Sequence, residues 1–199
     1  MSMIAGRILQ RNVALAAVAL AAAWSAPCFA QSQEISIRTV RDGEFVVVSA
    51  SVVMRVDLHV AWAVLSDYDQ LARFIPDMKS SRVISRDGNK LRVEQKGEMG
   101  FFFYKEPVSM LLDVHEEPPT RITARGIEGN IKGLETRYEL HSSAAGVRLD
   151  YAGRFIPDFS IPPLIGMPIM NRLIERRFRA MVNEIQRRDA LARAASKQK

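Results

Sequence analysis

The chain has 199 residues, with 28 Lys and Arg against 22 Asp and Glu. This length permits one domain or at most two small ones. The basic excess fits an approach to anionic lipid headgroups, but it falls well short of the charge balance of a nucleic-acid-binding protein. We therefore expect no nucleic-acid partner.

The first 30 residues have the pattern of a secretory signal peptide. Arg7 and Arg11 precede an apolar stretch over 13–23, and small residues stand three and one positions before a cleavage point after Ala30. The apolar stretch is shorter than the roughly 20 residues that cross a bilayer. Retention as an N-terminal anchor is an alternative, and Pro27 disfavours lipid attachment at Cys28. We expect an exported protein that resides in the periplasm.

The mature chain then consists of a single domain over 31–190 and a basic tail over 191–199, which is expected to fray. Cys28 is the only cysteine and leaves with the leader, so no disulfide, thiolate nucleophile or cysteine metal site is expected. The leader carries two of the basic residues and no acidic ones, which leaves a net charge of +4.

The first mature segments predict a hairpin and two short helices. Strands over 35–40 and 45–56 are rich in β-branched residues and flank the turn dipeptide Asp42-Gly43. Asp57 is a candidate N-cap for a helix over 58–65. A second short helical segment around Leu71 ends before Pro76. Two aspartates before it are interpreted as its side-chain caps, namely Asp67 and Asp69.

Six further segments alternate apolar with polar residues, as half-buried strands do. They are 82–86, 91–97, 108–114, 121–128, 134–140 and 147–155. The chain closes with apolar residues at three- and four-residue spacing over 167–191, which predicts one long amphipathic helix. Strands without βαβ alternation, followed by one helix, indicate an α+β fold with an antiparallel sheet.

Two stretches carry a resemblance to a known family. The first runs from Trp62 to Asp69 (WAVLSDYD) and continues with FIP at 74–76 and SRV at 81–83. The second is EGNIKGLE at 128–135, with Ile131 where an aromatic residue is common. Together they resemble the polyketide cyclase/dehydrase and lipid-transport family (SRPBCC), which includes coenzyme-Q-binding START-like proteins within the Bet v 1-like superfamily. The resemblance covers about residues 44–188.

This resemblance implies a helix-grip fold, in which a curved antiparallel sheet wraps around the long C-terminal helix and two short helices follow the early strand. Members of the family bind lipids, sterols, quinones or polyketides in an apolar cavity, and a few catalyse ring closure or dehydration. The fold alone does not choose among these functions.

The inward faces of the strands and of the helix supply candidate ligand-binding residues. Apolar walls with a few polar groups are typical of small-molecule sites, and the alternative is plain core packing. Buried hydroxyls require partners, so the threonine and the two tyrosines of this set could bind a ligand or one another. The candidates are Met110, Leu112, Thr136, Tyr138, Tyr151, Phe155, Met170, Leu173 and Ile174.

A second set of apolar residues is a candidate gate or membrane contact. It lies in the aromatic run after Gly100 and in the proline-rich link before the last helix. The alternative is packing, under a neighbouring loop or the short helices for the aromatic run and across the end of the sheet for the link. These residues are Phe101, Phe103, Phe159, Ile161, Leu164, Ile165 and Met167. Nearby arginines are placed to meet lipid phosphates, namely Arg172, Arg176, Arg177 and Arg179.

Catalysis has weaker support in the sequence. Three histidines fall at outer-face or surface positions, namely His59, His115 and His141. No phosphate-binding loop, metal-ligand cluster or Ser/His/Asp order is present, so we assign no catalytic residue, metal or cofactor. The best enzyme hypothesis uses Thr136, Tyr138, Tyr151 and Arg154 to polarise a polyketide carbonyl.

Three functions remain open. The first is an exported carrier or chaperone of a hydrophobic small molecule such as a lipid, quinone or isoprenoid, with peripheral membrane contact. The second is a polyketide cyclase or dehydratase. The third is an interaction module of the cell envelope that has a filled core and no ligand.

Overall fold

The computed structural model describes residues 35–101, 104–157 and 166–198. The expected signal peptide lies outside these ranges. Within them the chain forms eight strands, two α-helices and one 3-10 helix, in the order expected from the sequence.

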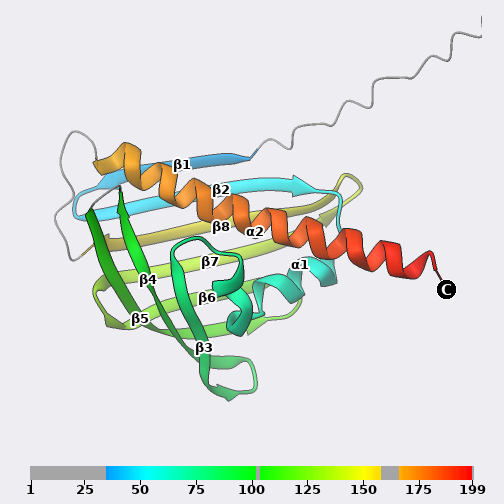
Figure 1. Ribbon diagram of the computed structural model, residues 1–199, viewed down its shortest axis with the longest axis horizontal. Coiled ribbons are helices and arrows are strands. Elements are labelled where there is room, and N and C mark those ends of the chain that lie inside the picture. Colours follow the sequence, from blue (N-terminus) through cyan, green and yellow to red (C-terminus); the bar gives the residue numbers. More distant parts are fainter. Residues whose placement is uncertain (1–34, 102–103, 158–165, 199) are drawn as a thin grey trace, which may run out of the picture. The chain divides into compact units, whose positions relative to one another are not determined.

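The eight strands pair antiparallel in one sheet, in the order β1-β2-β8-β7-β6-β5-β4-β3 (Figure 1). The first hairpin therefore pairs with the last strand, while β3 to β8 follow one another as a meander. The strands are β1 (Ser36–Asp42), β2 (Phe45–Met54), β3 (Met78–Asp87), β4 (Lys90–Phe101), β5 (Tyr104–Glu117), β6 (Arg121–Gly129), β7 (Ile131–Ser143) and β8 (Gly146–Pro157).

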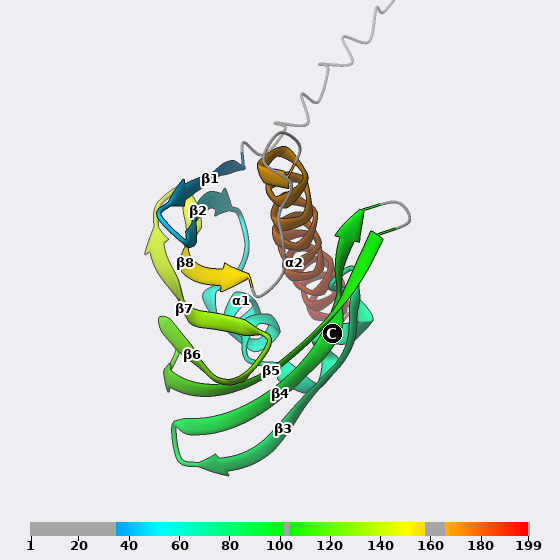
Figure 2. The ribbon, with the colours of Figure 1, turned by 90° about the vertical axis from the view of Figure 1, so that its left-hand side faces the viewer.

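The helices are α1 (Leu58–Leu65), the 3-10 helix η1 (Tyr68–Arg73) and α2 (Gly166–Ser196). The turned view shows the sheet curving around α2, with α1 near the middle of the curve (Figure 2). A curved antiparallel sheet around a long C-terminal helix is the helix-grip arrangement, so the predicted fold class is confirmed.

Alternation along each strand separates an inner face from an outer one, because successive side chains point to opposite sides of a sheet. On β2, Val46, Val48 and Val52 are buried, whereas Ser49 and Val53 are exposed. Burying one such side chain contributes about 1.5–3 kcal/mol. The inner face therefore supplies the core against which α2 packs.

Two-residue loops close the first two hairpins. Gly43 and Gly88 have φ values of 58° and 55°, in the left-handed region that glycine tolerates without strain. The paired residues around them are Asp42 with Phe45 and Asp87 with Lys90. These turns fix the register of β1 with β2 and of β3 with β4.

Helix α2 buries the apolar side chains Met170, Phe178, Met181, Val182 and Ile185. It continues past the expected end at Leu191 to Ser196, so much of the expected basic tail is helical. None of the helices in the described part of the chain combines the length and apolar character that a membrane span needs.

The start of α1 agrees with the sequence, but the start of η1 does not. The Asp57 carboxylate accepts hydrogen bonds from the backbone N–H of His59 (2.7 Å) and Val60 (3.3 Å), as an N-cap does. Asp67 precedes η1 without capping it by a side-chain bond. Its carboxylate accepts from Arg188 instead, and that of Asp69 accepts from the Val83 N–H, so the predicted caps were wrong.

Candidate functional site

An inner cavity of about 230 Å³ lies among side chains of the sheet's inner face and of α2. Side chains of α1, η1 and the segment after it also line it, namely Leu65, Tyr68, Leu71 and Ile75. The walls are mostly apolar, and the polar side chains among them are Gln95, Thr136, Tyr68, Tyr138, Tyr151 and Arg177. This composition, with few polar groups on apolar walls, is that of a small-molecule site.

Tyr138 and Tyr151 face each other across β7 and β8, where the two residues are partners in the strand register. Their ring centroids are 4.7 Å apart. Gly153 makes room for this arrangement, because a Cβ there would stand 2.5 Å from the Tyr151 hydroxyl oxygen. A side chain at 153 would therefore displace the phenol.

The two tyrosine hydroxyls are free to meet a ligand. Neither makes a hydrogen bond to another residue in the described ranges. Both side chains are half-buried and line the cavity. Burial raises the pKa of Tyr138 to about 12 and also raises the pKa of Tyr151, so both remain protonated hydrogen-bond donors at neutral pH.

Arg177 enters the same cavity from α2. Its Nη2 donates to the backbone carbonyl of Glu98 on β4 (2.9 Å). Its Nε is buried and has no hydrogen-bond partner among the described residues. Burial lowers the pKa of the Arg177 guanidinium, because removal from water disfavours the charged form. The sequence analysis grouped this arginine with those that would meet lipid phosphates at a membrane surface, whereas the structure places it on the cavity wall.

A second polar group lies beside the cavity, at Tyr68. Burial and then the nearby Glu116 carboxylate raise the pKa of the Tyr68 hydroxyl. Glu116 is only 4% exposed, and its Oε2 accepts from Arg86 Nη1 at 3.1 Å. The Tyr68 hydroxyl and Glu116 Oε1 make no hydrogen bond within the described ranges. The sequence analysis missed Glu116, although its even-numbered position on β5 continues the inward phase of Leu112 and Val114.

Most of the predicted ligand-binding residues lie on the cavity. The lining includes Met110, Leu112, Thr136, Tyr138, Tyr151, Phe155 and Ile174. Met170 is buried in the core, and Leu173 is half-buried, but neither lines the cavity. A contact of the lining residues with a ligand stays a prediction.

The candidate gate lies largely outside the described residues. Phe103, Phe159, Ile161, Leu164 and Ile165 are beyond the described ranges, and only the backbone of Phe101 is described, at the end of β4. Met167 is half-buried in the first turn of α2 and packs against the core.

The three histidines lie where the strand and helix phase predicts. His59, His115 and His141 are exposed, and His141 Nε2 lies 3.5 Å from Asp150 Oδ2 on the outer face.

Arg154 does not lie with the cavity tyrosines, as the enzyme hypothesis requires. It is exposed and pairs with Glu135 at 2.8 Å, so that placement was wrong. No group of three or more acidic, histidine or cysteine side chains suited to a metal ion occurs in the described part of the chain.

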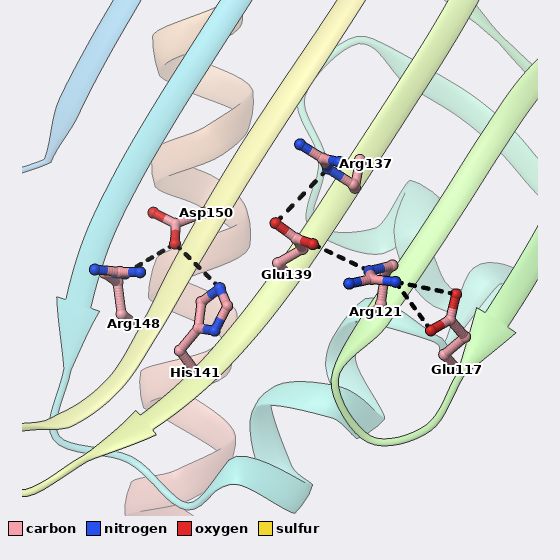
Figure 3. Close-up of polar contacts among 7 residues, drawn as sticks. All are labelled: Glu117, Arg121, Arg137, Glu139, His141, Arg148 and Asp150. Carbon is pink, nitrogen blue, oxygen red and sulfur yellow. Dashed lines mark hydrogen bonds and ion pairs between the residues drawn. The ribbon is translucent and has the colours of Figure 1, made fainter.

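A larger hollow of about 1000 Å³ lies along the outer face of the sheet. Many of its side chains are already ion-paired, as Arg92 is with Asp113 (3.4 Å) and Arg154 with Glu135. Figure 3 shows a neighbouring part of this face, where Arg121 and Arg137 flank Glu139 while α2 lies behind the strands. Because apolar walls distinguish small-molecule sites, the inner cavity is the stronger candidate.

The curved sheet and the C-terminal helix give the chain the START/Bet v 1-like helix-grip fold, with an apolar cavity that both elements line. A profile of the family described as "Polyketide cyclase / dehydrase and lipid transport" matches residues 54–182. The chain belongs to this family. No curated protein matches it by sequence.

Solved structures share the fold at low sequence identity. A STAR-related lipid transfer protein from Xanthomonas axonopodis is 15% identical with a TM-score of 0.60, over 79% of this chain and 95% of that one. The Zhui aromatase/cyclase from Streptomyces sp. R1128 is 15% identical with a TM-score of 0.55, over 75% and 92%. A START superfamily protein from Mycobacterium smegmatis is 14% identical with a TM-score of 0.55, over 73% and 98%. At these identities the likeness shows the fold alone.

Proposed function

We propose that the protein is an exported carrier that holds a hydrophobic small molecule in the inner cavity. The observation that carries this proposal is the apolar cavity of about 230 Å³ into which Tyr138, Tyr151 and Arg177 converge. A core closed by packing alone would leave no such space, because protein interiors are close-packed. Membership of a family that includes lipid transport supports the same function.

Lipids, quinones and polyketide-like rings are the ligand classes in view, with coenzyme Q as one member. The leader pattern supports export and a periplasmic location. Contact with an anionic membrane would give access to such ligands, and the exposed Arg172, Arg176 and Arg179 on α2 support it. Arg176 and Arg179 also pair with Asp77 and Glu175, which weakens this attraction.

The test fills each hollow in turn by a single substitution on β6. Ala124 borders both hollows, and it has the inward phase of the buried Ile122, so its side chain points to the inner cavity; its neighbour Thr123 lines the outer groove alone. We expect Ala124→Phe to weaken binding of the neutral probe N-phenyl-1-naphthylamine by about tenfold or more, because the ring occupies the binding space. Thr123→Phe is the matched control, and fluorescence titration is the measurement. A wild-type protein that takes up no probe, or weakening by Thr123→Phe alone, would contradict the proposal.

A cyclase or dehydratase is the second candidate, because Arg177 and the two tyrosines present hydrogen-bond donors that could polarise a carbonyl. Turnover separates it from a carrier. Conversion of a polyketide-like substrate that is lost in Tyr138→Phe, with probe binding retained, would favour the enzyme.

A further inference from the structure

Arg177 is the one charged side chain among the described residues that line the cavity. It stands on α2 between Ile174 and Phe178, which also line it. An arginine has five N–H donors and keeps its charge in proteins. A buried charge is costly unless an opposite charge or several hydrogen bonds compensate it.

The carboxylates near Arg177 are bound to its neighbours on the helix. Asp77 pairs with Arg176, and Glu175 pairs with Arg179. Arg177 itself donates to one backbone carbonyl, that of Glu98, and its Nε is left without a partner in the described ranges. The cavity therefore contains a positive charge whose compensation within the described protein is incomplete.

The two phenols extend this site. Tyr138 and Tyr151 line the same cavity as Arg177, and its charge lowers the pKa of both hydroxyls against the larger effect of burial. All three side chains therefore offer donors, and none of the three offers a negative charge. Apolar side chains such as Met110 and Leu112 line the same cavity. A ligand that matches both the donor groups and the apolar walls has an anionic acceptor group on a hydrocarbon body.

We propose that the ligand is an amphipathic carboxylic acid whose carboxylate is bound by Arg177 together with the hydroxyls of Tyr138 and Tyr151. This inference rests on the proposed carrier function. A guanidinium forms two parallel hydrogen bonds with a carboxylate, and such charge-assisted bonds are stronger than neutral ones. The cavity of about 230 Å³ has the volume of roughly eight water molecules. A medium-chain or ring-sized body suits this volume.

The experiment compares ligands that share one hydrocarbon body. Decanoic acid at pH 8, methyl decanoate and 1-decanol compete with N-phenyl-1-naphthylamine for the wild-type protein. The expected result is that the acid binds about 10- to 100-fold more tightly than the alcohol or the ester. Arg177→Met should abolish this preference, so that the acid and the alcohol bind about equally, and Arg177→Lys should retain part of it. Arg172→Met, which removes an exposed charge from the same helix and leaves the pair of Asp77 with Arg176 intact, is the matched control and should retain all of it.

The outcomes separate this inference from the carrier function. If the probe binds but the acid is no better than the alcohol, the carboxylate inference is overturned and the carrier function stands. An ester that binds as tightly as the acid also overturns it, because a neutral carbonyl then suffices. If neither the probe nor any competitor binds, both proposals fail. Should Arg177→Met not fold, the ratio of acid to alcohol on the wild-type protein and Arg177→Lys still decide the question.

Discussion

Glu184 on α2 is held by two arginines of the same helix. Arg187 donates two hydrogen bonds of 2.7 Å to its carboxylate, and Arg188 donates a third of 2.8 Å. Arg188 also reaches the Asp67 carboxylate at 2.8 Å, which ties the helix to the segment between α1 and η1. The hydrogen bonds from Arg187 are the main cause of a Glu184 pKa of about 2.

This lowered pKa predicts a loss of stability in acid. An unfolded glutamate has a pKa of about 4.3, so the folded state binds fewer protons between about pH 4.3 and pH 2. The contribution is therefore complete above about pH 5 and is lost as the pH falls towards 2. We expect Glu184→Gln to lower the free energy of unfolding by about 1–2 kcal/mol at pH 7, after allowance for solvent screening of the half-exposed Arg187.

Urea unfolding at pH 7, 5 and 3, followed by circular dichroism, measures this effect. The difference between the wild-type protein and Glu184→Gln should shrink as the pH falls. Glu175→Gln, which removes a more exposed pair with Arg179, should change stability by less than about 1 kcal/mol at every pH. A Glu184→Gln difference that is the same at pH 7 and pH 3 would contradict this account.

The polar residues of the cavity were only partly predictable. Tyr138 and Tyr151 follow from strand alternation, because the side-chain period of two places them on the same face as Leu140 and Leu149. Arg177 does carry a signal, since it stands three residues after Ile174 and four before Met181, which is the spacing of one helix face. A cation at such a position usually lies at the edge of the apolar stripe. Only the backbone carbonyl of Glu98, far away in sequence, explains why it enters the cavity.

The second half of α2 and the start of α1 are joined through one buried carboxylate. Asp189 is 5% exposed, and its Oδ1 accepts from the backbone N–H of Asp57 at 2.8 Å. Its Oδ2 accepts from Arg193 Nε at 2.5 Å, and Arg193 also donates to the Arg55 carbonyl. One side chain therefore links α2 to the start of α1, and through Arg193 to the segment that follows β2.

We predict that Asp189→Ala lowers the free energy of unfolding by about 1–3 kcal/mol, because it removes the acceptor of the Asp57 N–H and breaks the ion pair with Arg193. Asp189→Asn keeps an acceptor oxygen and should cost less. Asp57→Ala, which removes only the N-cap, should cost about 1 kcal/mol. Thermal and urea unfolding measure these values.

Probe binding by the folded Asp189→Ala variant should equal that of the wild-type protein, because Asp189 does not line the cavity. A stability within about 0.5 kcal/mol of the wild type would show that Asp189 does not join the two helices.

The elements themselves were largely predictable, because each strand has a buried and an exposed face. The alternation of β4, β7 and β8 and the amphipathic spacing of α2 agree with the structure. Details that depend on tertiary partners were not predictable. The sequence indicates that Asp67 is a helix cap, but in the fold its carboxylate accepts a hydrogen bond from Arg188 of α2. The helix extends beyond Leu191 to Ser196, and Arg193 in this last part is bonded to Asp189 and to the Arg55 carbonyl.

At the scale of the whole sheet, the two faces differ in kind. The inner face is apolar and holds the cavity, while the outer face pairs charges across strands, as Figure 3 shows for Arg121 with Glu139 and with Glu117. Exposed pairs of this type contribute at most about 1 kcal/mol each. The outer face therefore adds little stability, and the inner face holds the proposed binding site.

The central claim is that the inner cavity holds a hydrophobic small molecule. Native mass spectrometry of the protein isolated from its own host, followed by organic extraction, tests this claim most directly. The account predicts close to one bound molecule per chain, with a mass that disappears in Ala124→Phe and persists in Thr123→Phe. A protein that carries no molecule, and that takes up no neutral apolar probe when one is added, would contradict it.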